Sequence, residues 1–425
     1  MTLPASISAT LEKASQRLAA MPGAVETFAR CFVSTIETTT EVLDDGTTFV
    51  ITGDIPAMWL RDSSAQVRHY LPLAKHDPDL RRVIEGLIKR QVQCILIDPY
   101  ANAFNREPNG RCFSVDRTES GPWIWELKYE VDSLCNSLQL AYLYWQATGI
   151  TTIFDESFRE AVNNTLRLWQ TEQRHGEQSP YYFERTDCPE SDTLKNEGHG
   201  TPVNYTGMTW SGFRPSDDAC MYGYLVPSNM FAVVVLGYVA QIAEQVYRDD
   251  ALKRTAEELR QQIDAGIQAY GIVEHPKYGR IYAYEVDGFG HHNLMDDANV
   301  PSLLAIPYMG YAGKDDPIYR NTRKFLLSAD NPYYYEGKYA RGIGSPHTPA
   351  GYVWPISLSM QALTSDDPAE VEELIRMLLA TDAGTGFMHE SFDPDDPTRF
   401  TRDWFAWANS LFGEMVYRYL GLDVD

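Results

Sequence analysis

The sequence predicts an all-α protein built as an (α/α)6 toroid, with six inner helices in a ring and six outer helices around them. Long stretches carry apolar residues at spacings of three and four, which is the period of an α-helix. These stretches are of two kinds that alternate along the chain. Strand patterns are few, and no linker rich in Pro or Ser divides the 425 residues. We therefore expect one domain over residues 1–425.

The more apolar helices are the candidates for the inner ring. A helix that is apolar on nearly all sides, such as residues 230–242, must be buried on all sides. Inner candidates begin near residues 62, 130, 228, 301, 355 and 402. Amphipathic helices with a charged face suit the outer layer, over about 24–36, 79–97, 155–174, 249–270, 316–328 and 366–380. Because no strict sequence period accompanies the alternation, the predicted repeat is architectural only.

Two segments depart from the helical pattern. Residues 279–290 (GRIYAYEVDGFG) alternate in polarity and end in turn residues, which predicts a small hairpin. Residues 186–212 are rich in Asn, Gly and Ser and predict a long ordered loop. A loop of that length inside a compact domain usually has a function.

Charge and composition narrow the classes of function. The net charge of −23 opposes binding to nucleic acids or anionic membranes, which need a basic surface, and it suits a neutral substrate. The 26 Tyr and 9 Trp fill a large core, and they are also the side chains that stack on sugar rings. The composition therefore favours a carbohydrate over a charged polymer as partner.

The cysteines and the N-terminal residues predict a cytoplasmic protein. The six cysteines are scattered without a CxxC pair, so we expect reduced thiols and no zinc site. The N-terminal stretch lacks the apolar core of a signal peptide. No run reaches the roughly 20 apolar residues that cross a bilayer, so no membrane span is expected.

Polar and aromatic residues gather where each inner helix is expected to begin. The six clusters are 56–64 (PAMWLRDSS), 128–133 (KYEVDS), 213–220 (FRPSDDAC), 291–301 (HHNLMDDANVP), 345–355 (SPHTPAGYVWP) and 386–397 (GFMHESFDPDDP). Antiparallel pairing of inner and outer helices brings all six clusters to the same end of the toroid. That mouth would hold Arg61, Asp62, Asp132, Arg214, Asp217, Asp218, Asn299, His347 and Glu390.

A purely structural interpretation applies to each acid taken singly. Ser, Asp and Asn before a helix are common N-caps, and Pro301 and Pro355 suit the first turn of a helix. Asp296 and Asp297 similarly suit the capping of residues 299–301. Capping does not explain the Trp, Arg and His residues beside the acids.

The acids of the mouth match the chemistry of glycoside hydrolysis. That reaction needs one protonated carboxyl group that donates to the leaving oxygen and one carboxylate that attacks or activates water. Asp217, Asp218 and Glu390 are the candidates. Because adjacent residues point in different directions, only one of the two aspartates is expected to face the substrate. His291 and His292 have no third ligand at a recognisable spacing and no HExxH motif, so we expect no metal.

Five segments resemble glycoside hydrolase family 125, the exo-α-1,6-mannosidases. They are 53–73 (GDIPAMWLRDSSAQVRHYLPL), 128–134 (KYEVDSL), 211–220 (SGFRPSDDAC), 291–304 (HHNLMDDANVPSLL) and 386–392 (GFMHESF), which span nearly the whole chain. The resemblance implies an (α/α)6 fold that hydrolyses terminal α-1,6-linked mannose with inversion and without a metal or other cofactor. The partner would be a mannose-terminated oligosaccharide.

The same resemblance implies roles for individual residues. The general acid is an aspartate of the RPSDD segment, either Asp217 or Asp218, with a slight preference for Asp217. The general base is Glu390. We expect burial near Phe213 and Trp210 to raise the pKa of the acid, which must stay protonated. The predicted substrate contacts are Trp59, Arg61, Asp62, Asp132, Arg214, His292, Asn299 and His347.

Two rival functions fit the same toroid. A sugar epimerase would be expected to use histidines such as His347 and His389 as proton shuttles. A mannoside-binding protein would bind the sugar and release none. The carboxylates spread over the predicted rim loops favour hydrolysis over both.

Overall fold

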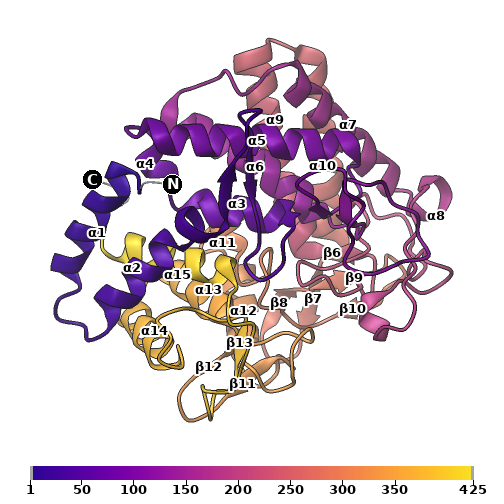
Figure 1. The fold of residues 1–425 in the computed structure, drawn as a ribbon. Helices are drawn as coiled ribbons and strands as arrows, with labels where there is room; N and C mark the ends of the chain where they lie inside the picture. The colour runs from indigo at the N-terminus through magenta and orange to yellow at the C-terminus, as the bar shows by residue number, and fades with distance from the viewer. Residues whose placement is uncertain (1–2, 423–425) are drawn as a thin grey trace.

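The computed structural model describes residues 3–422, in which helices predominate and most of the labelled strands lie in the lower half of the view (Figure 1). The inner helices are α3 (Leu60–Arg68), α6 (Val131–Thr148), α9 (Val226–Ile242), α11 (Ile306–Met309), α13 (Pro355–Leu363) and α15 (Ala406–Tyr419). The outer helices are α2 (Ala24–Ser34), α5 (Pro78–Ile97), α7 (Glu156–Glu172), α10 (Asp250–Tyr270), α12 (Pro317–Leu326) and α14 (Pro368–Ala380). The predicted alternation of six apolar and six amphipathic helices is confirmed.

Packing between the inner helices forms the ring. Helix α3 contacts α6, α6 contacts α9, α9 contacts α11, and α13 contacts α15, which returns to α3. The outer helices lie against this ring, with α5 on α6, α10 on α9, α14 on α13 and α2 on α15. The ends of the described chain meet, because α1 (Ala5–Arg17) lies against α2 and the Arg17 guanidinium donates to the carbonyl of Leu420.

The fourth inner helix differs most from its prediction. A long helix was expected from about residue 301, but α11 is a single turn that begins at Ile306. Gly310 ends it in the left-handed region at φ 91°, which stops helical hydrogen bonding after one turn. Pro301 therefore lies in the loop before the helix and not in its first turn, whereas Pro355 does begin α13 as predicted.

Aspartate caps belong to the outer helices and not to the inner ones. The side chains of Asp77, Asp155, Asp249, Asp316 and Asp367 accept backbone N–H bonds at the starts of α5, α7, α10, α12 and α14. Within residues 3–422, none of the six inner helices has a side-chain cap. The capping interpretation therefore fails for the acids at the inner-helix starts, and their carboxyl groups are available for other contacts.

Asp296 and Asp297 are the exception, because both bind backbone within their own loop. Asp296 accepts from the amides of Leu303 and Leu304 at 2.8 and 2.9 Å. Asp297 accepts from the backbone and side-chain nitrogens of Asn299. The predicted capping of residues 299–301 is therefore confirmed for Asp297, whereas Asp296 caps residues 303 and 304 instead.

Short strands hold the rim together. The pairs and triplets are β1 (Thr40–Val42) with β2 (Thr48–Val50); β3 (Met58–Trp59), β4 (Ala103–Phe104) and β5 (Ile124–Glu126); β6 (Tyr224–Leu225), β9 (Glu285–Val286) and β10 (His292–Asn293); β7 (Ile272–His275) with β8 (Gly279–Tyr282); β11 (Tyr334–Glu336) with β12 (Arg341–Ile343); and β13 (Ser391–Phe392) with β14 (Phe400–Thr401). Strands β3 and β6 lead directly into α3 and α9. Paired backbone thus fixes where these two inner helices start.

The predicted hairpin forms with different strand pairings, and the predicted loop is present. Strands do form within residues 279–290, but β8 pairs with the preceding β7, and β9 pairs with the following β10. Residues 186–212 form the expected long loop, whose described regular structure is one 3-10 turn, Glu190–Asp192.

Helix α9 forms the most apolar part of the ring. Together with the π-helical turn Ala243–Tyr247, it is long and apolar enough by composition to cross a membrane. The expectation that no segment of the chain reaches this length is therefore wrong. Yet 78% of its most apolar 18-residue stretch is buried inside the fold. The expectation that an all-round apolar helix lies in the core is confirmed.

Candidate active site

A small pocket opens where the inner helices begin. The space between its walls, open solvent at the mouth included, is about 370 Å³. Its lining comes from the starts of α3 and α15 and from the segments before α9, α11 and α13. The predicted convergence of rim clusters is therefore present in the structure.

Seven of the predicted site residues line this pocket, and four do not. Those in the lining are Trp59, Arg61, Asp62, Asp217, Asn299, His347 and Glu390. Asp218, Asp132, Arg214 and His292 lie outside the lining. The structure therefore separates the two adjacent aspartates, as expected for neighbouring residues in a tight turn.

Asp217 is at the tip of a turn that presents its carboxyl group to the pocket. Its amide donates to the carbonyl of Arg214 at 2.9 Å, and its backbone adopts a left-handed φ of 66°. Aspartate is among the few residues other than glycine that tolerate this conformation. The Lys128 ammonium donates to the Asp217 carbonyl at 2.7 Å, and this hydrogen bond stabilises the turn. The carboxyl group remains 25% exposed.

The pKa of Asp217 differs from the expectation. Burial alone would raise it, but the nearby Arg61 guanidinium, reinforced by Lys128, holds the pKa of Asp217 well below its ordinary range. The predicted neighbour Trp210 instead stacks on His175, with ring centroids 3.5 Å apart. The expected upward shift of the pKa is therefore wrong for this carboxyl group.

Asp218 turns away from the pocket toward His347. Its Oδ1 lies 3.0 Å from Nδ1 of His347, and its side chain is almost fully buried. Burial would lower the pKa of His347, but the hydrogen bond and the charges of Asp218, Glu390 and Asp217 raise it to about 9. His347 is therefore a cation at neutral pH, at the wall of the pocket.

Arg61 is held by a cluster of carboxyl groups at the base of the pocket. Its Nη1 lies 2.7 Å from Glu130 and 3.2 Å from Asp132, and its Nη2 lies 3.1 Å from Asp217. Its Nε lies 3.5 Å from Asp62, whose pKa is raised to about 6 chiefly by burial. Arg61 thus fixes acids from three separate segments around one point.

Glu390 lines the same pocket as Arg61 and Asp217 but belongs to a different segment of the chain. It precedes β13, and its amide donates to the carbonyl of Thr401 at 3.2 Å, which anchors it to β14. Its Oε1 lies 3.6 Å from Nη1 of Arg402, whose Nε bonds Asp54 at 3.0 and 3.1 Å. Glu390 therefore reaches the pocket from the sixth rim cluster, beside a guanidinium that is itself held by Asp54.

Besides the Arg61 Nε that faces Asp62, two buried donors in the pocket lining have no hydrogen-bond partner within residues 3–422. They are the indole Nε1 of Trp59 and the hydroxyl of Ser216. Buried polar groups are normally hydrogen-bonded, so an unpartnered donor at a pocket wall indicates a site for a ligand or water. Both groups suit the hydroxyl oxygens of a sugar.

The remaining predicted contacts have structural partners instead. Asp132 is fully buried behind Arg61 and reaches Ser228 at 3.4 Å. Arg214 forms a buried pair with Glu285, Nε to Oε1 at 2.6 Å, and not with Asp62 or Asp132. His292 is exposed on β10.

Histidines elsewhere do not assemble a metal or shuttle site in the part of the chain that the structure describes. His291 pairs with Asp287 at 2.6 Å, and no group of three or more His, Cys, Asp or Glu residues is placed to hold a metal ion within residues 3–422. His389 stacks on Phe400 at 3.7 Å and lies outside the pocket lining, which weighs against a two-histidine epimerase.

Several lining residues were missed by sequence reasoning. They are Thr52, Ile55, Pro215, Ser216, Trp354, Arg402, Phe405 and Trp407. The segment TRDWFAW (401–407) carries the same mixture of polar and aromatic residues as the other rim clusters and directly precedes the sixth inner helix. That resemblance between clusters was the available signal for Arg402, Phe405 and Trp407.

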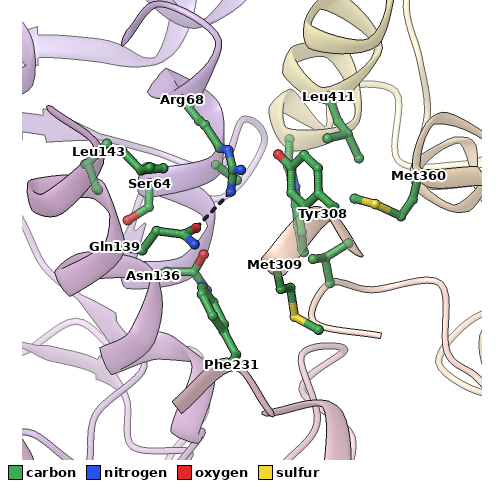
Figure 2. Close-up of a pocket in the computed structure, with 14 residues that line it drawn as sticks. Ser64, Arg68, Asn136, Gln139, Leu143, Phe231, Tyr308, Met309, Met360 and Leu411 are labelled. Atoms are coloured by element: carbon green, nitrogen blue, oxygen red, sulfur yellow. Dashed lines mark hydrogen bonds between the residues drawn. The ribbon is translucent and has the colours of Figure 1, made fainter. Parts of the chain in front are cut away.

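Trp407 lies between this pocket and a second cavity, because it lines both. This side chain is buried, lies under the Arg61 guanidinium at 5.7 Å from the ring centroid, and belongs to the lining of a second cavity in the bore of the toroid. Figure 2 shows the bore, with Arg68 donating to Gln139 on one wall and Tyr308, Met309, Met360 and Leu411 on the other. No Asp or Glu occurs among the described residues that line this cavity in the bore. The acids of the site therefore line the pocket at the starts of the inner helices.

Known proteins resemble this chain over nearly its whole length. A solved α-mannosidase structure from Streptococcus pneumoniae, described as metal-independent and as a non-productive complex with α-1,6-mannobiose, is 52% identical, with a TM-score of 0.96 and 98% of both chains covered. The meiotically up-regulated gene 157 protein of Schizosaccharomyces pombe is 42% identical over 92% of this chain and 81% of that protein.

More distant structures share the fold alone. A bacterial glucoamylase complexed with acarbose matches with a TM-score of 0.57 at 11% identity, covering 85% of this chain and 49% of the other.

The model of one family, the metal-independent α-mannosidases of glycoside hydrolase family 125, matches residues 22–417. With its toroid, its acid-lined blind pocket and this match, the chain belongs to glycoside hydrolase family 125, the metal-independent α-mannosidases.

Proposed function

We propose that this protein is an exo-acting α-1,6-mannosidase that hydrolyses terminal mannose with inversion of configuration. The observation that supports it best is the placement of Asp217 and Glu390 on different loops of one pocket. Two carboxyl groups flanking a bond are what glycoside hydrolysis requires. The S. pneumoniae relative, solved with α-1,6-mannobiose, supports the choice of linkage.

The shape of the pocket supports attack on a chain end. Trp407 lines both the pocket and the cavity in the bore, so its indole lies between the two. Trp59 and Ser216 offer unpartnered donors to the hydroxyls of that unit. Cleavage of single terminal residues follows from such a blind pocket.

In the proposed mechanism, Asp217 protonates the glycosidic oxygen and Glu390 takes a proton from water. The water oxygen forms a bond to the anomeric carbon while the bond to the leaving oxygen breaks. Arg402 holds Glu390 in place through their 3.6 Å contact, and Trp59, His347 and Asn299 hold the sugar. Asp218 acts through His347, which it orients by the 3.0 Å contact.

Proton NMR of the enzyme with α-1,6-mannobiose, followed from the first minutes, tests this function. Early β-mannose supports both the hydrolase and the inverting mechanism. Early α-mannose keeps the hydrolase and overturns inversion. No mannose, with α-1,2- and α-1,3-linked controls also unreactive, overturns the proposed function and leaves a mannoside-binding role.

We also propose that the enzyme acts in the cytoplasm on mannose-terminated fragments of N-glycans. All six cysteines are free thiols in the structure, which suits a reducing compartment. The work on the S. pneumoniae relative concerned the processing of N-linked glycans, which supports this substrate class. Cell fractionation and digestion of a trimmed high-mannose N-glycan test the two parts separately; activity in the medium alone would contradict the first.

A further inference from the structure

The cluster around Arg61 holds more acid groups than one cation can balance. Glu130, Asp132, Asp217 and Asp62 all lie within 3.5 Å of this single guanidinium. Arg61 is itself buried. Lys128 and Arg402 add positive charge near Asp217 and Asp62, which leaves Glu130 and Asp132 to share Arg61. Buried carboxylates that lack a compensating charge are strongly unfavourable, so a proton within the cluster relieves the excess of negative charge.

The hydrogen bonds indicate which group carries it. The Oε2 of Glu130 accepts from Arg61 at 2.7 Å and from the hydroxyl of Ser133 at 2.8 Å. The Oε1 of Glu130 is buried and accepts no hydrogen bond from the protein. An ionised carboxylate would leave that oxygen unsatisfied, whereas a protonated Oε1 becomes a donor. The Glu130 side chain is also fully buried.

The acceptor for that proton is Asp217. Glu130 and Asp217 lie on the same guanidinium, Glu130 at 2.7 Å from Nη1 of Arg61 and Asp217 at 3.1 Å from Nη2, so their carboxyl groups are neighbours. Two carboxyl groups bond to one another only when one of them is protonated. Burial raises the pKa of Glu130 well above its usual range against the pull of Arg61, while Arg61 holds the pKa of Asp217 low despite its burial. A proton on Glu130 is then shared with Asp217.

Other ionisable groups face Glu130 but do not replace this partner. Asp132 lies on the same helix and also binds Arg61. The Tyr181 phenol and the Cys220 thiol approach from the neighbouring loops, and burial keeps the pKa of each well above its usual range. Both therefore stay neutral and leave the Glu130–Asp217 pair as the titrating unit.

We propose that Glu130 is a positioning residue that stores the proton which Asp217 delivers to the glycosidic oxygen. This inference rests on the proposed hydrolase function. The Glu130 proton moves to Asp217, and the Asp217 proton moves to the leaving oxygen as the glycosidic bond breaks. The pair is left with one more negative charge beside Arg61. The proton that Glu390 takes from water returns through solvent, so the cycle balances.

The test compares a substrate that needs protonation with one that does not. Glu130→Gln keeps the size and hydrogen bonds of the side chain but removes its acidic proton. We expect kcat on α-1,6-mannobiose to fall about 100-fold or more, within the range that general acid catalysis contributes. The same variant should retain most of its kcat on α-mannosyl fluoride, because fluoride departs with little protonation.

Asp132→Asn is the matched control. It removes another buried carboxylate from Arg61, so a purely structural role of these acids predicts that both variants lose activity equally on both substrates. Equal losses on the two substrates in Glu130→Gln, or no loss on mannobiose, would overturn the inference. An inactive wild-type enzyme would instead overturn the proposed function.

A second variant covers the case in which Glu130→Gln does not fold. Glu130→Asp keeps the acidic group and withdraws it from Asp217 by one methylene. We expect the alkaline limb of its kcat–pH profile on mannobiose to move toward lower pH, with the profile on the fluoride unchanged. Identical shifts on both substrates, or none, would contradict proton storage.

Discussion

Glu390 and Asp217 differ in what surrounds their carboxyl groups. Arg402 lies 3.6 Å from Glu390. Asp217 lies 3.1 Å from Arg61, which also holds Glu130 at 2.7 Å. The proposed acid therefore belongs to a cluster of carboxyl groups, whereas the proposed base lies beside a guanidinium on a different loop.

Replacement of Glu390 by glutamine should remove the base without disturbing the fold. We expect kcat on α-1,6-mannobiose to fall by about 10²–10⁴, the usual contribution of a general base. The melting temperature should stay close to that of the wild type, because glutamine has the same shape. Turnover above a few per cent of wild type would exclude Glu390 as the base.

His347 should make stability depend on pH in the alkaline range. Its pKa in the folded protein is about 9, above the roughly 6.5 of an unfolded histidine. The contact with Asp218 therefore contributes its full stability below pH 6.5 and loses it as pH rises through 9. The side chain is 38% exposed, so solvent screening keeps the effect small.

The measurement for His347 is a melting temperature at pH 6, 7.5 and 9.5. The advantage of the wild type over His347→Gln should shrink steadily toward pH 9.5. An advantage that is constant over this range would show that the ion pair does not contribute as stated.

Prediction from the sequence succeeded for residues whose neighbours in the chain are also their neighbours in the site. Trp59, Arg61 and Asp62 belong to one cluster and reach one pocket. Arg402 was missed because its partner Asp54 lies 348 positions away, and only ring closure brings the two together. Arg214 was predicted as a substrate contact but pairs with Glu285, which belongs to a different rim segment.

At the scale of elements, the pattern of apolar residues was enough to predict most of the helices and the layer to which each belongs. Twelve alternating helices could be predicted because each buries one face or all faces, and the pattern records that burial. Helix α11 was overestimated because Gly310 and Pro307 interrupt an apolar run whose composition alone looks helical. The capping of the outer helices was not distinguished from the acids of the rim, because both use aspartate just before a helix.

The cap of α5 provides a prediction about stability alone. Asp77 accepts from the amides of Asp79 and Leu80 and from both donors of Ser6. Asp77→Ala should lower the free energy of unfolding by about 1–2 kcal/mol at neutral pH, with kcat unchanged.

Urea denaturation measures this loss, and Asp79→Ala in the same turn is the control. Asp79 is exposed and pairs only with Arg82 at 3.4 Å, so its removal should change stability little. Because the pKa of Asp77 is lowered in the fold, its contribution should vanish as pH falls through that pKa. Equal effects of the two substitutions would contradict the cap.

At the scale of the whole molecule, the family description predicts independence from metals. Dialysis against a strong chelator should leave kcat on α-1,6-mannobiose within experimental error of the untreated enzyme. The family matched over residues 22–417 is one of metal-independent α-mannosidases. A loss of activity that added calcium or zinc restores would contradict this prediction.

The closure of the ring by α15 has a consequence for synthesis of the protein. Helix α15 lies between α13 and α3 and also against α2, so the last helix joins the first part of the fold. Trp59, Arg61 and Asp62 leave the ribosome early, but Phe405 and Trp407 emerge only with this helix. A nascent chain therefore carries Arg61 and Asp62 on an incomplete ring until α15 has been synthesised and packs between α13 and α3.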